Sequence, residues 1–329
     1  MDVAIGLDLG GTDLKWALVD ARGRCRAEGS VPTVADQGRR GLVACFGTAT
    51  RAAADCANKK RLRVVATGLG LPGGVQGARG LVTVVPPQIP GIRGLAVAAL
   101  LSKLTGVPAV AENDATVAAL AEARCGAGRG KQSVLMLTVG TGLGGGLVIN
   151  GRTVRGIHGT GGEIGHALFK PGGIPCRHDG LAGQGCLELY TSASALRRIH
   201  GELGGEAELS PREIVQRARR GDATARAALA QIGTNLGLGV SSAAALVDPE
   251  VIIVGGGLSA AGNLLLAPMR KAFRLQTIRP LIRGTPIVRA KLGNTAGSVG
   301  AALLALEELA LKSQRASRAS NKSRKVPSV

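Results

Sequence analysis

Short apolar runs in the N-terminal part of the chain predict a sheet that begins with a hairpin. The first run ends at the glycine pair Gly10 and Gly11, and a second apolar run follows directly. Two apolar runs joined by a tight glycine turn are typical of a β-hairpin. The spacing of apolar positions then predicts a helix before the next buried run. The expected order is strand, strand, strand, helix and strand over residues 3–8, 14–19, 25–31, 36–57 and 62–68.

The same order recurs in the second half of the chain. Residues 133–139 and 145–149 form another pair of apolar runs, again joined by a glycine-rich turn. Two strand-rich units that each begin with a glycine hairpin predict a duplicated α/β fold, with two lobes and a central interlobe cleft. The remaining expected elements are strands over 250–254 and 286–290 and helices over 95–104, 115–124, 187–199, 211–219, 223–247, 261–273 and 296–311.

These patterns also predict where the lobes begin and end. Residues 1–112 are expected to form a small N-terminal α/β lobe, which the C-terminal helix 297–311 joins, and residues 113–296 a large α/β lobe. Beyond Glu308 the chain carries six basic residues and no acid. Such a composition predicts a disordered basic tail over 312–329.

Composition supports the α/β prediction and narrows the partners. The 329 residues are 45% hydrophobic but only 2% aromatic, and 51 of them are glycine. A core of small aliphatic residues suits strands covered by tightly packed helices. The net charge of +19 first suggests nucleic acid. Because the positive charges are scattered and aromatic side chains for base stacking are scarce, a solvated basic surface is favoured over a specific nucleic-acid groove.

The cysteines and the ends of the chain bear on its compartment. Six irregularly spaced cysteines are too few for a disulfide scaffold. The chain opens on a predicted strand without the features of a signal peptide, and no uninterrupted apolar run is long enough to span a membrane. We therefore expect a cytoplasmic protein in a reducing compartment, with no membrane partner.

Two glycine-rich turns are candidates for binding phosphate. The first runs from Asp8 to Lys15 and places a carboxylate at a strand end before two glycines and a threonine. Bare N–H groups can face phosphate oxygens, and Asp8 can hold Mg²⁺ through water. The second runs from Thr138 to Gly146 directly after a buried strand. An ordinary structural turn explains either segment as well, and the second segment matches neither a Walker loop nor a Rossmann loop.

Polar side chains also gather after the strand that precedes helix 115–124. Asn113 and Asp114 stand at the start of that helix, where both residues are good N-caps. The helix dipole is expected to lower the pKa of Asp114 and keep it ionised, which suits a base that accepts a hydroxyl proton. Both interpretations stay open at this point.

Histidines and cysteines gather between residues 158 and 186. Two imidazoles and two thiols can ligate a tetrahedral zinc ion, and the alternative is an unliganded surface loop. A triple glycine follows the strand over 250–254, where bare backbone can admit a base or a ribose. The potential ligands are His166, Cys176, His178 and Cys186, and the glycines are Gly255, Gly256 and Gly257.

Taken in order, these segments resemble the ROK family of sugar kinases and sugar-responsive repressors, and glucokinases in particular. The resemblance rests on D-x-G-G-T, E-N-D-A, G-T-G-x-G-G-G, G-E-I-G-H and G-C-L-E, which begin at residues 8, 112, 140, 162 and 185. It covers residues 3–311. It implies the duplicated two-lobed actin/hexokinase/Hsp70-like ATPase fold and a homodimer or homotetramer.

The resemblance also implies roles for individual residues. Asp114 matches the general base, and the nucleotide is expected to meet both glycine turns and the triple glycine. His166 matches the first zinc ligand of the family, whereas His178 stands where the family has a thiol. The implied sugar ligands are Asn113, Glu163, His166 and Glu188, and the implied nucleotide-binding residues are Asp8, Gly10, Gly11, Thr12, Lys15, Thr141, Gly142 and Gly255 to Gly257.

The resulting hypothesis is a kinase that transfers the terminal phosphoryl group of ATP to a hexose, in first place to the 6-hydroxyl of glucose. Mg²⁺ is the expected cofactor, and a structural Zn²⁺ is an additional expectation. The alternatives are a kinase for another hexose or an N-acetylhexosamine, a glucokinase that uses polyphosphate, and a non-catalytic sugar-responsive regulator.

Overall fold

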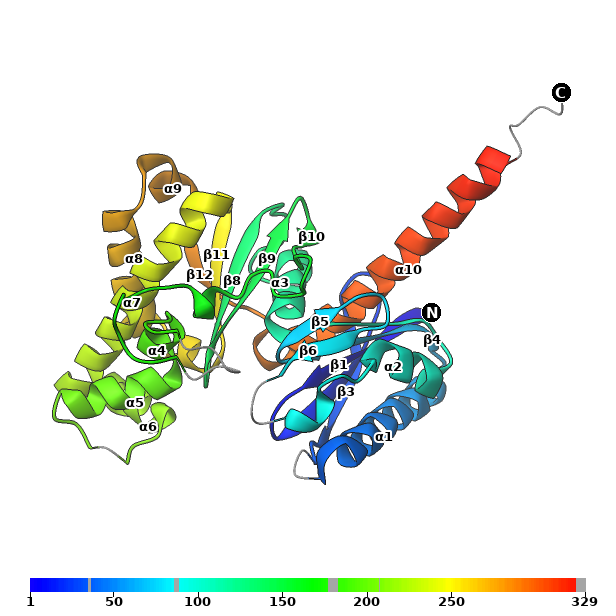
Figure 1. Ribbon diagram of the computed structural model, residues 1–329, viewed down its shortest axis with the longest axis horizontal. Helices are drawn as coiled ribbons and strands as arrows, with labels where there is room; N and C mark the ends of the chain where they lie inside the picture. Colours follow the sequence, from blue (N-terminus) through cyan, green and yellow to red (C-terminus); the bar gives the residue numbers. More distant parts are fainter. Residues whose placement is uncertain (35–36, 86–88, 177–182, 207, 324–329) are drawn as a thin grey trace. The chain divides into compact units, whose positions relative to one another are not determined.

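The protein is described by a computed structural model covering all residues except 35–36, 86–88, 177–182, 207 and 324–329 (Figure 1). The chain divides into two compact units. One contains residues 1–117 and 297–329, and the other contains residues 118–296. Each unit has its own five-stranded sheet.

The sheet of the first unit is built around its first strand. Strand β1 pairs antiparallel with β2 and parallel with β4, and the sheet order is β3-β2-β1-β4-β7. The strands are β1 (Asp2–Leu9), β2 (Asp13–Val19), β3 (Cys25–Pro32), β4 (Arg63–Leu71) and β7 (Ala109–Asn113). The predicted glycine hairpin is therefore confirmed.

The two faces of β1 pack against different helices. Val3, Ile5 and Leu7 alternate along the strand and belong to the core that α1 (Gly38–Lys59) and α2 (Val97–Thr105) complete. The opposite face carries Gly6, where a side chain would collide with the backbone of α10 (Ala296–Ser323). This alternation also places Asp8 on the face that α10 covers.

The second unit repeats this topology. Its sheet order is β10-β9-β8-β11-β12. Strand β8, the first of these strands in sequence, pairs antiparallel with β9, and β9 pairs antiparallel with β10. Strands β11 and β12 extend the sheet in parallel. The strands are β8 (Val134–Val139), β9 (Leu143–Ile149), β10 (Arg152–Thr153), β11 (Val251–Gly255) and β12 (Ile287–Arg289). The matching orders confirm the predicted duplication.

Long helices cover the second sheet. Helices α7 (Ala223–Val247) and α8 (Asn263–Gln276) lie side by side (Figure 1). Gly233 and Gly237 make this close packing possible, because a side chain at either position would collide with the backbone of α8. Helix α6 (Pro211–Arg219) begins with a capping box formed by Ser210 and Glu213, as its sequence predicts.

Several elements differ from the prediction. The expected helix over 187–199 is interrupted at Ser192, which caps α5 (Ala193–Glu202) after the short α4 (Glu188–Thr191). Strands β5 (Gly74–Gln76) and β6 (Leu81–Val84) form a small hairpin that the pattern did not indicate. The remaining helices are α3 (Asp114–Cys125) and α9 (Arg279–Gly284).

The C-terminal helix is longer than predicted. Helix α10 continues to Ser323 and therefore runs through the first part of the segment for which composition indicates disorder. The residues after Ser323 lie outside those described. None of the described helices combines the length and apolar character that a membrane-spanning segment needs.

Candidate active site

Asp8 lies at the end of β1 in the first unit. It stands opposite Lys15 across the β1–β2 pair and beside Gly70 on β4. Burial raises the pKa of Asp8 to about 6, the negative charge of Asp114 adds to that shift, and Lys15 partly offsets it. The two carboxyl groups are therefore electrostatic neighbours within one unit.

A glycine explains how Asp114 comes so near the sheet. Gly70 stands beside Asp8 in the parallel pair of β1 and β4. A Cβ atom at Gly70 would lie 2.7 Å from Cγ2 of Val117 and 3.6 Å from Cα of Asp114. The missing side chain thus lets the first turn of α3 lie against the strand. This close approach brings Asp114 near enough to Asp8 for the two carboxyl groups to interact electrostatically.

The protonation behaviour of Asp114 differs from the expectation. Its Oδ1 accepts a hydrogen bond from the Ala115 N–H at 2.7 Å, which favours the ionised form. Desolvation by the surrounding protein outweighs that bond and raises the pKa, although part of the side chain reaches the surface. The predicted lowering of the pKa by the helix dipole is wrong, because loss of water contact is the larger effect.

Asn113 has the structural role that its position suggested. Its Oδ1 accepts the Thr116 N–H at 3.0 Å and so caps α3. Its Nδ2 donates to the backbone oxygen of Gly73 at 3.2 Å. The side chain is 8% exposed. Any sugar contact by Asn113 would use the remaining hydrogen-bonding capacity of an amide that is already held in place.

The first glycine turn is accessible. The N–H of Gly10 donates to the backbone oxygen of Asp13 at 3.0 Å and closes the hairpin turn. Gly11 and Thr12 are exposed, and a side chain at Gly11 would meet nothing within 4 Å. Packing against the described residues therefore does not explain this glycine, and its bare backbone is open to a ligand.

In the second unit Glu188 lies against the other glycine turn. Its Oε2 accepts the N–H of Leu143 at 2.8 Å. A side chain at Gly142 would collide with the same carboxylate. The contact with Glu188 therefore explains why residue 142 is a glycine. From the sequence, this glycine had been linked only to phosphate binding. Thr141, the residue before it, is exposed.

Two further glycine-rich motifs of the second unit pack closely against each other. A side chain at Gly145 would collide with the backbone oxygen of Gly162, and one at Gly165 with that of Leu143. This contact places the short 3-10 turn η3 (Ile164–His166) against β9. Glu163 is half-buried and His166 is exposed, and Glu188 comes from α4 after the same loop. The turn that carries Glu163 and His166 therefore packs against the glycine-rich start of β9, and the Glu188 carboxylate accepts a hydrogen bond from the N–H of Leu143 at the same strand start.

The triple glycine lies beside the end of β8. Gly256 has a φ of 78°, and a side chain there would lie 2.5 Å from the backbone oxygen of Val139. Gly255 packs on Met136, while a side chain at Gly257 would meet nothing within 4 Å. Gly256 is therefore required by the fold, whereas a side chain at Gly255 would need only the flexible end of Met136 to shift. Gly257 is the glycine of the three whose bare surface is open to a ligand.

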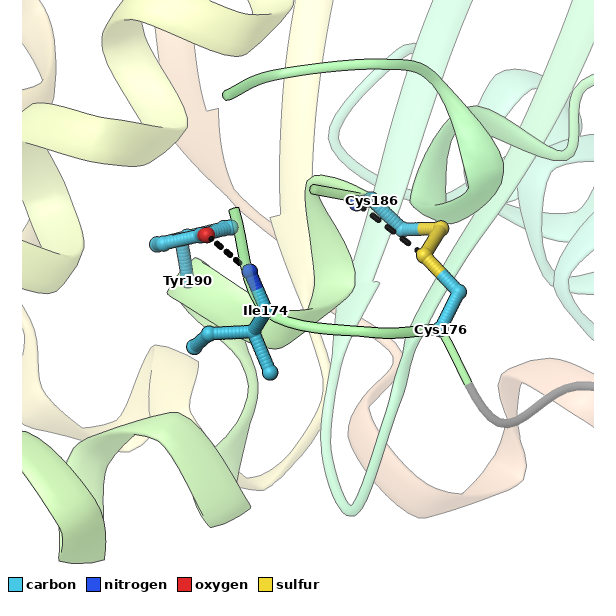
Figure 2. The surroundings of a disulfide bond; sticks show 4 residues. All are labelled: Ile174, Cys176, Cys186 and Tyr190. Carbon is cyan, nitrogen blue, oxygen red and sulfur yellow. Dashed lines mark hydrogen bonds between the residues drawn. A yellow bond between two sulfur atoms is a disulfide. The ribbon is translucent and has the colours of Figure 1, made fainter. Parts of the chain in front are cut away.

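The predicted zinc ligands are arranged differently. Cys176 and Cys186 form a disulfide, and the N–H of Cys186 also donates to the Cys176 sulfur at 3.2 Å (Figure 2). Sulfur atoms bonded to each other are not available as thiolate ligands. His178 lies outside the described residues. Among the residues that the structure describes, no group of three or more His, Cys, Asp or Glu side chains can hold a metal ion.

The disulfide loop is also fixed at its base. The N–H of Ile174 donates to the Tyr190 hydroxyl at 2.9 Å, as Figure 2 shows. Tyr190 belongs to α4, the helix that begins with Glu188. The loop that separates His166 from Glu188 is therefore attached both through its disulfide and through this hydrogen bond.

A model of the ROK family matches residues 4–308, which include most of both units. The chain belongs to the ROK family. Among the relatives of this ROK protein is the glucokinase of Streptomyces coelicolor, 33% identical over 93% of this chain and 98% of the relative. The N-acetylmannosamine kinase of Escherichia coli O9:H4 is 31% identical over 92% of this chain and 98% of that protein.

Solved structures agree with this membership. A ROK family glucokinase from Streptomyces griseus, in complex with glucose and AMPPNP, superimposes on this ROK protein with a TM-score of 0.79. The two are 34% identical, and the alignment covers 93% of this chain and 99% of the other. The predicted family and the predicted two-lobed hexokinase-like α/β fold are both confirmed.

Two glycines of this ROK protein contact the candidate site but were not predicted from the sequence. Gly70 lies against α3 as described above. Gly297, at the start of α10, lies against the carboxyl group of Asp8. Gly297 could have been recognised from the sequence. Glycine in the first turn of an Ala- and Leu-rich helix lowers helix propensity, so its presence there indicates another role.

Proposed function

We propose that this protein is a sugar kinase that transfers the γ-phosphoryl group of ATP to the 6-hydroxyl of glucose, with Asp114 as the general base. The observation that carries the proposal is the raised pKa of Asp114 at the first turn of α3. A carboxylate with a raised pKa is a stronger proton acceptor than an ordinary surface aspartate. The glucokinases among its relatives support glucose as the acceptor.

Asp8 is the residue proposed to hold Mg²⁺, through water. Its fit to a divalent cation rests on its own surroundings, since a desolvated carboxyl beside a second carboxyl is stabilised by positive charge. When bound, Mg²⁺ neutralises charge on the phosphate oxygens of ATP. Lys15, across the hairpin from Asp8, adds a further positive charge at the same turn.

The remaining roles follow from the same hypothesis. Asp114 accepts the proton of the sugar hydroxyl as that oxygen attacks the γ-phosphorus, while the bond from this phosphorus to the β,γ-bridging oxygen breaks and ADP leaves. Positioning and charge compensation account for most of the catalysis in such transfers. The proposed sugar ligands are Asn113, Glu163, His166 and Glu188, and the proposed nucleotide-binding residues are Gly10, Gly11, Thr12, Thr141, Gly142, Gly255, Gly256 and Gly257.

Zinc is not given a role in this mechanism. With Cys176 and Cys186 in a disulfide, the ligand set does not fit the ion. Zinc binding by His166, Cys176, His178 and Cys186 remains a prediction for the reduced chain alone. Cytoplasmic location, a homodimer or homotetramer, and the lack of a specific nucleic-acid partner likewise remain predictions.

The test is a coupled assay of ADP release with ATP and Mg²⁺ over a panel of sugars. Glucose should give turnover, and 6-deoxyglucose, which lacks only the acceptor oxygen, should give none while still competing with glucose. Preferred turnover of N-acetylmannosamine would move the assignment to the second candidate, which the E. coli relative supports. Replacing ATP by polyphosphate tests the alternative donor, and lack of turnover with every sugar would contradict the kinase proposal.

A further inference from the structure

Helix α10 is held against the first sheet by contacts between backbones. A side chain at Gly6 of β1 would collide with the backbone oxygen of Ser298, and a side chain at Gly68 of β4 with that of Ala301. Gly6 and Gly68 stand side by side in the sheet. Because backbone meets backbone at both points, α10 has little freedom to shift away from the strands.

The contact at Gly297 is of a different kind. Here the neighbour is an ionisable side chain of the candidate site. A Cβ atom at Gly297 would lie 2.5 Å from Oδ2 and 2.7 Å from Oδ1 of Asp8 and would also overlap its Cγ. All three atoms of the carboxyl group therefore occupy space that any other residue at position 297 would need.

Backbone conformation does not explain this glycine. Gly297 is absent from the glycines with positive φ, so an L-residue fits its backbone conformation. Glycine also destabilises a helix relative to alanine. The glycine is thus required for steric reasons, because the Asp8 carboxyl group occupies the space that a side chain at position 297 would need.

We propose that Gly297 is a positioning residue, which sets the orientation of the Asp8 carboxylate by leaving it room against the start of α10. A Cβ at position 297 must displace either the helix or the carboxylate. Since the contacts at Gly6 and Gly68 hold the helix, the Asp8 side chain is the group that moves. This inference rests on the proposed function of Asp8 at the Mg²⁺–nucleotide site.

The first test is the Gly297→Ala variant, assayed for its dependence on Mg²⁺. A misplaced carboxylate should lower kcat by about 10- to 100-fold and raise the Mg²⁺ concentration for half-maximal rate, with the KM for glucose nearly unchanged. The matched control is Gly47→Ala in α1, where the added methyl group would approach only the end of the Arg51 side chain, at 4.0 Å. The control should keep wild-type kinetics.

A double-mutant cycle shows whether Gly297 acts through Asp8. In an Asp8→Ala background the carboxyl group is gone, so adding Gly297→Ala should cause no further loss of rate. The same double-mutant cycle can be measured by melting temperature, which does not depend on activity. Gly297→Ala should lower Tm when Asp8 is present. In the Asp8→Ala background, the same change should leave Tm equal or raise it. Independent losses in both backgrounds would overturn the proposal, because the methyl group would then disturb the fold itself.

Failure of the inference is distinguishable from failure of the proposed function. If Asp8→Ala retains the wild-type rate and Mg²⁺ dependence, the role of Asp8 is wrong. If Asp8→Ala loses activity while Gly297→Ala behaves like Gly47→Ala, only the positioning role of Gly297 is wrong.

Discussion

Asp8 in the first unit and Glu188 in the second are both carboxylates that lie against a glycine, yet their surroundings differ. Glu188 receives the backbone N–H of Leu143. Asp8 instead lies near a second carboxyl group, and burial raises its pKa to about 6. A carboxylate that the protein already hydrogen-bonds is suited to orient a neutral ligand. Two desolvated carboxyl groups side by side are suited to a cation and a proton.

This contrast divides the proposed chemistry between the units. The first unit carries an electrostatic cost that a bound cation or proton removes, whereas the second holds its carboxylate by fixed backbone contacts. The following changes test that division, beginning with the largest expected effect.

Replacing the proposed base should separate catalysis from binding. Asp114→Asn should lower kcat by about 10²- to 10⁴-fold, because the amide cannot accept the hydroxyl proton. Stabilisation by glucose in a thermal-shift assay should persist. The exposed Asp55→Asn in α1 is the control with the same change of charge. Near-normal kcat in Asp114→Asn would remove Asp114 from the role of base.

Opening the disulfide should weaken the second unit. Cys176→Ser should lower the free energy of unfolding by about 3 kcal/mol, since the bond spans ten residues of sequence and restricts the unfolded chain. Denaturant unfolding measures the change, with the exposed free Cys25→Ser as control. In the denatured, unreduced chain four thiols should react, corresponding to Cys25, Cys45, Cys56 and Cys125. Six reactive thiols would contradict the disulfide and restore the ligands that zinc requires.

Changes around Glu188 should act on the sugar. Glu188→Gln should raise the KM for glucose by about 10- to 100-fold, as expected for loss of a charged hydrogen-bonding group. Gly142→Ala should have a similar effect, because its methyl group would displace the same carboxylate. Gly201→Ala, a helical position with open space, is the control. A rise confined to the KM for ATP would assign Gly142 to the nucleotide alone.

The smallest expected effect is on stability as a function of pH without divalent cations. Because the pKa of Asp8 is about 6 when folded and near 3.8 when unfolded, the folded state binds the proton more tightly. Its contribution to stability is therefore largest below pH 4 and is lost as pH rises through 6. Lowering the pH from 7 to 5 should add about 1 kcal/mol. Asp8→Asn should remove that gain, and an equal gain in the variant would assign it to other groups.

Much of the fold could be predicted from local sequence. The glycine hairpin before Asp13 and the capping box at Ser210 depend on residues close together in the chain. The repeated succession of strands and helices along the chain could also be predicted from local patterns. The break at Ser192 was missed because apolar periodicity continues through it, while its side chain caps the next helix. The extension of α10 beyond residue 311 was missed because charge composition does not measure helix propensity.

For the candidate site, the sequence by itself determined which groups are present: a carboxylate at a strand end, an Asn–Asp pair before a helix, and three glycine-rich turns. Only the tertiary structure decided which groups meet. It brought Asp114 near Asp8 through Gly70, reversed the expected direction of the Asp114 pKa, and joined Cys176 to Cys186. The physical reason is the distance along the chain between the residues that interact. Turns and caps depend on neighbouring residues, whereas desolvation and collision depend on atoms that the chain brings together from distant positions.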